Sequence, residues 1–341
     1  MDAPLERETE NLRKSWMQHD AAMLRDYLVA GVEDPRVNAQ SILTRHSLIH
    51  HLFPGRFEAL MEHELRFSAV LSWAGRILAE AGGNDDLRAI EHALRRGADD
   101  AEGIRIPRFV LTTYAGLPAA AGDLVVPNYL GAVFAQDVEG IDAPAPAPAI
   151  LSTFADLWHG ALRDCPTEPL TVLELACGSA NDYRFFNSFG LARWIDYTGV
   201  DLCEKNIQNA LEMFPQVRFA IGNALEINAP ARAFAATLAQ DLFEHLSPAA
   251  LDRAMDEVCR VTDRILCLGL FNAWEGDEHL VQPLADYHWS RLSIPRLRQR
   301  LEQDGFDVRV IHIDTLLKWR CQCAETHNPN AYTLLAERRH G

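Results

Sequence analysis

The sequence predicts an α/β protein in which a doubly wound sheet follows a mainly helical N-terminal region. From residue 151 onward, apolar β-prone runs alternate with segments of helical periodicity, which is the pattern of repeated βαβ units. The first of these runs ends in a turn of small residues, as the nucleotide-binding strands of doubly wound sheets do. The preceding 140 residues show helical spacing without this alternation. A length of 341 residues allows two domains.

The N-terminal region is predicted to form a helical bundle or cap. Apolar residues recur at helical spacing over residues 5–29, 35–52 and 56–81, and a shorter helix follows up to Arg95. Glycine and proline separate these segments, as expected at helix ends. We therefore place a helical domain at residues 1–140.

The pattern weakens between residues 99 and 140, where Gly and Pro recur among short apolar runs. The most apolar stretch, residues 115–135, is interrupted by two prolines and an aspartate, so we do not expect it to span a membrane. Alternating Pro and Ala residues at 141–150 favour extended polyproline geometry and predict a linker. The sheet domain then occupies residues 151–341.

The strongest local signal is the segment 171–183, which runs from an apolar strand through a tight turn into a helix. Gly178 lies in this turn with small neighbours that include Ala176 and Ala180, and Glu174 stands just before it. Such a turn lets a ligand lie against bare backbone at a helix N-terminus. We therefore predict a cofactor site here.

Three further strand-to-helix units follow in order. Residues 195–201 form an apolar run that ends in Asp201, whose carboxylate is placed to accept hydrogen bonds from ribose hydroxyls. The next run leads into Asn223, and the one after it ends at Asp241. Four ordered units of this kind are much harder to explain by chance than one.

Together, these units resemble motif I and the succeeding segments of class I S-adenosylmethionine-dependent methyltransferases. Motif I in that family reads acidic-x-Gly-x-Gly-x-Gly, so Glu174 matches the acid while Ala176 and Ala180 replace two glycines. The resemblance implies S-adenosyl-L-methionine as cofactor, with Asn223 near the adenine and Asp241 facing the methionine end. Asn223 stands where the family commonly has Asp, and its side-chain carbonyl still accepts a hydrogen bond. The implied cofactor-binding residues are Glu174, Ala176, Gly178, Asp201, Leu202, Asn223, Ala224 and Asp241.

The resemblance also implies a Rossmann-like seven-stranded methyltransferase sheet whose last strand is antiparallel. It covers residues 151–341 and does not extend to the first 140 residues. A helix at 151–163 precedes the first strand, and another at 294–304 follows the fifth. The predicted strands are 171–175, 195–201, 217–221, 235–241, 264–271, 307–313 and 331–337.

Methyl transfer from a sulfonium needs an oriented acceptor and exclusion of water, and a hydroxyl acceptor also benefits from a general base. His245 is the first candidate for this base, because it follows the fourth strand at the carboxyl edge of the sheet. It could instead only hold the start of the next helix. His288 is the second candidate, and Trp274 and Trp289 could form an aromatic wall for the acceptor. These aromatics could equally pack beneath a loop.

The composition excludes several other classes. Forty-eight acidic residues against 32 Lys and Arg give a net charge of −16, which is the wrong sign for binding nucleic acid. The acidic N-terminus lacks the pattern of a signal peptide, and the seven scattered cysteines suit a reducing compartment, so we expect a cytoplasmic protein without a membrane partner. No metal is predicted. Cys321 and Cys323 lack a second pair, and His46 and His50 are more simply hydrogen-bonded on a helix.

We therefore expect methyl transfer to a small-molecule acceptor, at oxygen or nitrogen. The helical domain would shape the acceptor pocket or form a homodimer interface. Two alternatives stay open. The chain could methylate a protein through an acidic groove that accepts basic peptides, or it could be a non-catalytic subunit that binds the cofactor.

Overall fold

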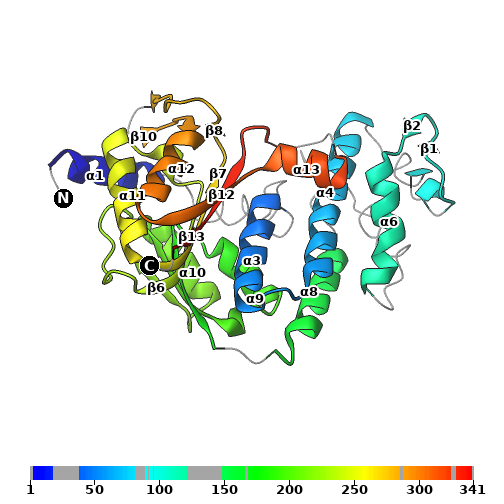
Figure 1. The fold of residues 1–341 in the computed structure, drawn as a ribbon, viewed down its shortest axis with the longest axis horizontal. Helices are drawn as coiled ribbons and strands as arrows, with labels where there is room; N and C mark the ends of the chain where they lie inside the picture. Colours follow the sequence, from blue (N-terminus) through cyan, green and yellow to red (C-terminus); the bar gives the residue numbers. More distant parts are fainter. Residues whose placement is uncertain are drawn as a thin grey trace.

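The computed structural model describes residues 3–17, 38–81, 89–90, 92–94, 96–121, 148–165, 168–284, 287–323 and 328–339. These contain a seven-stranded sheet in the order β12-β13-β7-β6-β3-β4-β5 (Figure 1). Neighbouring strands are parallel except at β13, which is antiparallel to both of its neighbours. This arrangement confirms the predicted Rossmann-like methyltransferase sheet. Its strands are β3 (Leu170–Leu175), β4 (Ile195–Asp201), β5 (Arg218–Ile221), β6 (Phe234–Gln240), β7 (Thr262–Leu270), β12 (Phe306–His312) and β13 (Tyr332–Arg338).

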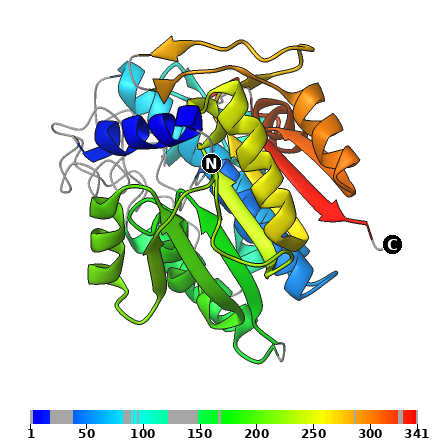
Figure 2. The ribbon, with the colours of Figure 1, turned by 90° about the vertical axis from the view of Figure 1, so that its left-hand side faces the viewer.

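Both faces of the sheet are covered by helices (Figure 2). Successive strand side chains point to opposite faces, so Val172 belongs to one hydrophobic core and Leu173 to the other. Right-handed crossovers place the helix after each parallel strand on one of these two faces. The face of Val172 carries α9 (Asn181–Ser188) and α10 (Glu204–Met213), and the face of Leu173 carries α11 (Pro248–Val261) and α12 (Ile294–Gln303).

Helix α3 from the N-terminal region lies directly on the sheet. Gln40 Nε2 donates hydrogen bonds to the carbonyl oxygens of Leu270 (3.0 Å) and Tyr332 (2.9 Å). The same hydrophobic core that holds the sheet continues through Trp158 of α8 to Trp73 of α4, and α6 lies beyond α4 (Figure 1). The N-terminal helices are α1 (Ala3–Met17), α3 (Ala39–Leu52), α4 (Glu58–Ala81), α6 (Arg108–Ala121) and α8 (Pro148–Leu162).

Helix α6 lies in the stretch after residue 99, where the sequence pattern is weak and no individual helix was predicted. Phe109 and Val110 of α6 are buried, and the helix packs against α4. Tertiary packing of this kind stabilises a helix despite the presence of Gly116 and Pro118, both of which weaken it. A short hairpin precedes α6, made of the two-residue strands β1 (Asp100–Ala101) and β2 (Ile104–Arg105).

The predicted helix at 5–29 corresponds to α1 as far as Met17. Residues 18–37, and residues 141–147 of the predicted linker, lie outside the described residues. No helix among the described residues is long and apolar enough to cross a membrane. The remaining short elements are η1 (Ala192–Trp194), η2 (Phe243–His245), β8 (Ala273–Trp274), β9 (Pro283–Leu284), β10 (Tyr287–His288), β11 (Leu292–Ser293) and α13 (Ile313–Cys321).

Candidate active site

The turn after β3 adopts the backbone of a glycine-rich turn although two of its three key positions are alanines. Ala176, Gly178 and Ala180 have φ angles of 54°, 54° and 63°. These values lie in the left-handed region, which glycine enters freely and which costs an alanine about 1–2 kcal/mol. Backbone strain of this kind concentrates at functional sites, where the surrounding structure maintains it. The alanines therefore preserve the shape of the turn at a cost in stability.

Glu174 lies beneath this turn, in the interior. Its side chain is only 3% exposed, and Tyr197 donates a hydrogen bond to Glu174 Oε2 at 2.5 Å. Burial, and next the negative charge of Asp182, raise the pKa of Glu174 well above its ordinary value. The carboxyl group is thus held by the protein at the base of the turn.

Asp201 joins the turn to the end of β4. Its Oδ2 accepts a hydrogen bond from the Gly178 N–H (2.9 Å), and its Oδ1 accepts one from the Cys203 N–H (2.7 Å). Burial raises the pKa of Asp201, while these backbone donors act in the opposite direction. The half-buried Leu202 follows Asp201 and packs against the hydrophobic core on the Leu173 face of the sheet. Asp201, Leu202 and Gly178, which were each predicted to bind the cofactor, are therefore brought together.

Asn223 lies at the end of β5, where its side chain meets helix α1. Its Oδ1 accepts a hydrogen bond from the Leu225 N–H (2.9 Å), and its Nδ2 donates to Thr9 Oγ1 (3.1 Å). Ala224 next to it is half-buried. Sequence reasoning missed Ile221, which is 52% exposed and pairs in register with Asp201. An apolar residue at a strand end directly before a glycine could have indicated it.

Asp241 lies at the end of β6, exposed and with a left-handed φ of 50°. Its N–H donates to the Gly269 carbonyl (3.0 Å), while Gln240 Nε2 donates to Thr44 Oγ1 of α3 (2.8 Å). The carboxyl ends of parallel strands meet at one edge of a sheet, so Asp241 shares this edge with Asp201 and the turn after β3.

His245 lies in η2 within a group of aromatic rings. Its ring centroid is 5.5 Å from that of Phe271, 5.9 Å from Tyr287 and 5.6 Å from Trp289. Its Nδ1 is 3.3 Å from the backbone carbonyl of His288. Burial lowers the pKa of His245 below 6.5, so the imidazole is neutral at neutral pH.

The two catalytic candidates therefore meet through the backbone of His288, whose Nδ1 is buried without a hydrogen-bond partner among the described residues. The ring of Trp289 lies against His245, where an aromatic wall was predicted. Trp274, the other predicted member of this wall, instead donates from Nε1 to the Glu278 carbonyl (3.1 Å). The ring centroids of Phe271 and Trp289 are 4.8 Å apart. Phe271 therefore takes the place beside Trp289 that was predicted for Trp274.

Helix α1 connects the two parts of this edge, and sequence reasoning did not foresee this. Besides the Thr9 contact with Asn223, Glu8 accepts hydrogen bonds from the Ser247 N–H (2.7 Å) and Oγ–H (2.5 Å). Ser247 is the N-cap of α11 and lies two residues after the end of η2. Figure 2 shows α1 beside α11 and the ends of the green strands.

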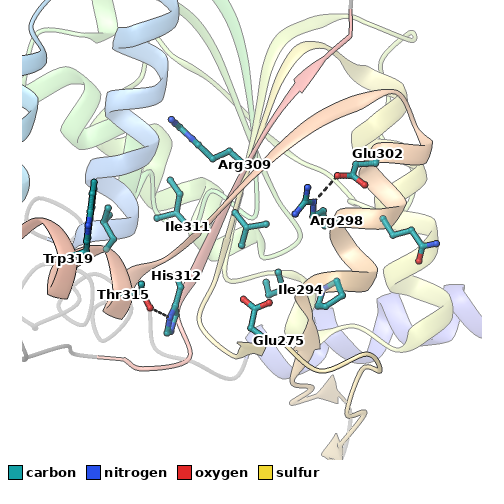
Figure 3. A pocket seen from close by; sticks show the side chains of 13 residues that line it. Glu275, Ile294, Arg298, Glu302, Arg309, Ile311, His312, Thr315 and Trp319 are labelled. Atoms are coloured by element: carbon teal, nitrogen blue, oxygen red, sulfur yellow. Dashed lines mark hydrogen bonds and ion pairs between the residues drawn. The ribbon is translucent and has the colours of Figure 1, made fainter.

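A cavity of about 620 Å³ lies elsewhere, around the edge strand β12 (Figure 3). Its walls come from α12 and α13, and none of the predicted site residues lines it. Labelled residues in Figure 3 include Arg298, which pairs with Glu302 (2.8 Å), and Trp319, which is 77% exposed. Strand β12 lies at one edge of the sheet, so this cavity is separated from the strands β3, β4 and β6 that carry the candidate site.

His46, one of the residues weighed as metal ligands, has another partner. His46 Nε2 lies 2.5 Å from Glu64 Oε2, and Arg45 also pairs with Glu64. Cys321 and Cys323 are buried. Among the described residues no three His, Cys, Asp or Glu side chains gather as metal ligands.

The sequence of this region is similar to that of a known protein family. A family model described as a methyltransferase domain matches residues 172–264, which include the turn after β3, Asp201, Asp241 and His245. The sequence matches no curated protein.

Several solved structures resemble the chain. An S-adenosylmethionine-dependent methyltransferase from Methanosarcina mazei is 15% identical, with 53% of this chain and 97% of that one covered and a TM-score of 0.40. One from Mesorhizobium loti is 15% identical, with coverages of 54% and 98% and a TM-score of 0.40. The 1,6-didemethyltoxoflavin-N1-methyltransferase from Burkholderia thailandensis is 18% identical, with coverages of 55% and 76% and a TM-score of 0.38.

Proposed function

We propose that the methyltransferase domain of this chain is a class I S-adenosylmethionine-dependent domain that methylates a small-molecule acceptor at an oxygen or nitrogen atom. When bound, the cofactor would supply a methyl group on a cationic sulfonium: the acceptor atom would bond to the methyl carbon in line as the carbon–sulfur bond breaks, with S-adenosylhomocysteine as the leaving group. In our proposal the turn after β3 and Asp201 hold the adenosine, with Leu202, Ile221 and Ala224 against the adenine. Asp241 lies at the methionine end.

The observation that carries the proposal is the neutral, largely enclosed His245 within its aromatic rings at the carboxyl edge. A carbonyl oxygen only accepts hydrogen bonds, so the contact with the His288 carbonyl requires the proton of the neutral ring to be on Nδ1. The lone pair is then on Nε2. An imidazole in this form is a competent general base for a hydroxyl acceptor.

The surrounding rings support a small acceptor over an extended peptide. Phe271, Tyr287 and Trp289 offer apolar area for a compact molecule and limit the access of water to the reacting atoms. Helix α1 would act as a cap on the acceptor side, because Glu8 attaches it to Ser247 beside η2. This favours the cap role of the helical region over a dimer interface.

The test is to incubate the full-length protein with S-adenosylmethionine and either the ultrafiltered small-molecule pool or the protein fraction of the same lysate. We expect S-adenosylhomocysteine to form with the small-molecule pool. Formation with the protein fraction alone would replace the proposal by protein methylation. Cofactor binding by calorimetry without turnover on either fraction would indicate the non-catalytic subunit.

A further inference from the structure

Glu244, the residue before His245, is fully buried and joins three separate segments. Its Oε1 accepts hydrogen bonds from the backbone N–H groups of Phe271 (2.7 Å) and Asn272 (3.2 Å), just after β7. Its backbone carbonyl accepts one from the Ser290 N–H (2.8 Å), just after β10. Asn272 Nδ2 also donates to the Ser290 carbonyl (3.2 Å), which closes this set of contacts.

Each of these contacts fixes a neighbour of the imidazole of His245. Phe271, whose N–H binds Glu244, presents one ring to His245, and Trp289, next to Ser290, presents another. The carbonyl that orients His245 Nδ1 belongs to His288, two residues before Ser290. The surroundings of His245 therefore depend on Glu244.

We propose that the Glu244 side chain is a positioning residue: it holds the segment of Phe271 beside His245 directly, and through Asn272 it supports the Ser290 segment that carries Trp289 and the His288 carbonyl. This inference rests on the role proposed above for His245 as the base. Glu244 acts through His245 and through the shape of the acceptor wall, without contacting the methyl group.

The protonation state of Glu244 fits this role. Burial, and next the charge of Asp241, raise the pKa of Glu244 to about 8, so the carboxyl is neutral at neutral pH. A neutral carboxyl keeps one oxygen as the acceptor for the two backbone donors and carries its proton on the other. Its Oε2 is buried without a hydrogen-bond partner among the described residues. A glutamine side chain has the same shape and the same carbonyl acceptor, so it imitates the neutral form.

The experiment follows the imidazole of His245 by NMR in full-length protein labelled at the histidine ring carbon, with the signal assigned by its loss in His245→Gln. In the wild type we expect a ring-current shift from the aromatic neighbours and a pKa below 6.5. Glu244→Ala should decrease the ring-current shift and raise the pKa of His245 towards 6.5, because the acceptor of the Phe271 and Asn272 N–H groups is lost while the backbone contact with Ser290 stays. Glu244→Gln should keep both.

The matched control is Glu257→Ala. Glu257 is also a buried glutamate that accepts a backbone N–H, from Ile227 at 2.7 Å, but it lies on α11. The Glu257→Ala substitution should lower the stability of the protein without moving the NMR signal of His245. If Glu244→Ala does not fold, Glu244→Asp replaces it, because one methylene less prevents the carboxyl from reaching both donors. An unchanged His245 pKa and shift in the folded variant, or an equal change in Glu257→Ala, would overturn the proposal.

This readout needs no acceptor, so the two proposals fail separately. A wild-type protein that binds the cofactor but methylates nothing would reject the proposed function, whatever the NMR result. An unmoved His245 signal would reject the positioning role, even in an active enzyme.

Discussion

The turn after β3 and the aromatic wall around His245 lie at the same edge of the sheet, yet different kinds of contact hold them. The turn is fixed by its own left-handed backbone and by hydrogen bonds to the adjacent strand, from Gly178 to Asp201, 23 residues away, and from the Cys177 N–H to the Val200 carbonyl (3.1 Å). The wall is assembled from separate segments, through the contact of Glu244 with Phe271, 27 residues away, and of His245 with His288, 43 residues away.

This difference separates two tasks. In our proposal the turn after β3 and Asp201 form the cofactor half of the site, which sheet hydrogen bonds hold in place and which can serve any acceptor. An acceptor half built from η2 and the segments after β7 and β10 can vary without disturbing the sheet. Substitutions should therefore separate cofactor affinity from the rate of transfer.

The largest expected effect is in the cofactor half, from Asp201→Ala. It removes the proposed acceptor of two ribose hydrogen bonds, each worth about 1.5–3 kcal/mol to a charged group, so the Kd for S-adenosylhomocysteine should rise roughly 10³-fold. Calorimetry measures this directly. Asp196→Ala is the control on the same strand, because Asp196 is exposed and pairs with Arg218 at 2.5 Å. Equal affinity in the Asp201 variant and the wild type would refute the assignment.

The next effect is in the acceptor half, from His245→Ala. Loss of a general base should lower the single-turnover rate about 10²-fold while leaving cofactor affinity unchanged. Burial lowers the pKa of His245, and only the neutral ring accepts a proton. The wild-type rate should therefore fall as pH drops through a value below 6.5, and the variant should lose this dependence. A rate that survives the substitution would leave His245 a structural role and favour an amine acceptor.

The same contrast explains what could be predicted from the sequence. Gly178 and Asp201 each belong to a local strand-to-helix unit, so residue type and order were enough to predict that they lie together at one edge of the sheet. Phe271 and Glu244 acquire their roles only when distant segments meet, and no local pattern records which strand end faces His245. Helix α1 is the extreme case, because Thr9 and Asn223 are 214 residues apart and Glu8 and Ser247 are 239 apart.

Helix α1 contacts both Asn223 and Ser247, so Glu8→Ala should change cofactor affinity and transfer rate together. The substitution removes both hydrogen bonds to Ser247 and loosens α1 over Asn223 as well. With about 1–1.5 kcal/mol lost, cofactor affinity and transfer rate should both fall up to about tenfold. Glu6→Ala, at an exposed position of the same helix, is the matched control. A decrease in rate alone would restrict α1 to the acceptor half.

The smallest effect tests whether strain in the cofactor half is real. Ala176 is exposed and has a φ of 54°, so Ala176→Gly removes the left-handed penalty without losing buried surface. After the extra chain entropy of glycine, we expect a gain of about 0.5–1 kcal/mol in the free energy of unfolding by urea. Ala180 has a similar φ but is fully buried, so Ala180→Gly also loses a buried methyl worth about 0.8 kcal/mol and should show little gain. Equal losses at both positions would mean that the alanines adopt the turn without strain, and that contacts with neighbouring segments set its shape, as they do for the wall around His245.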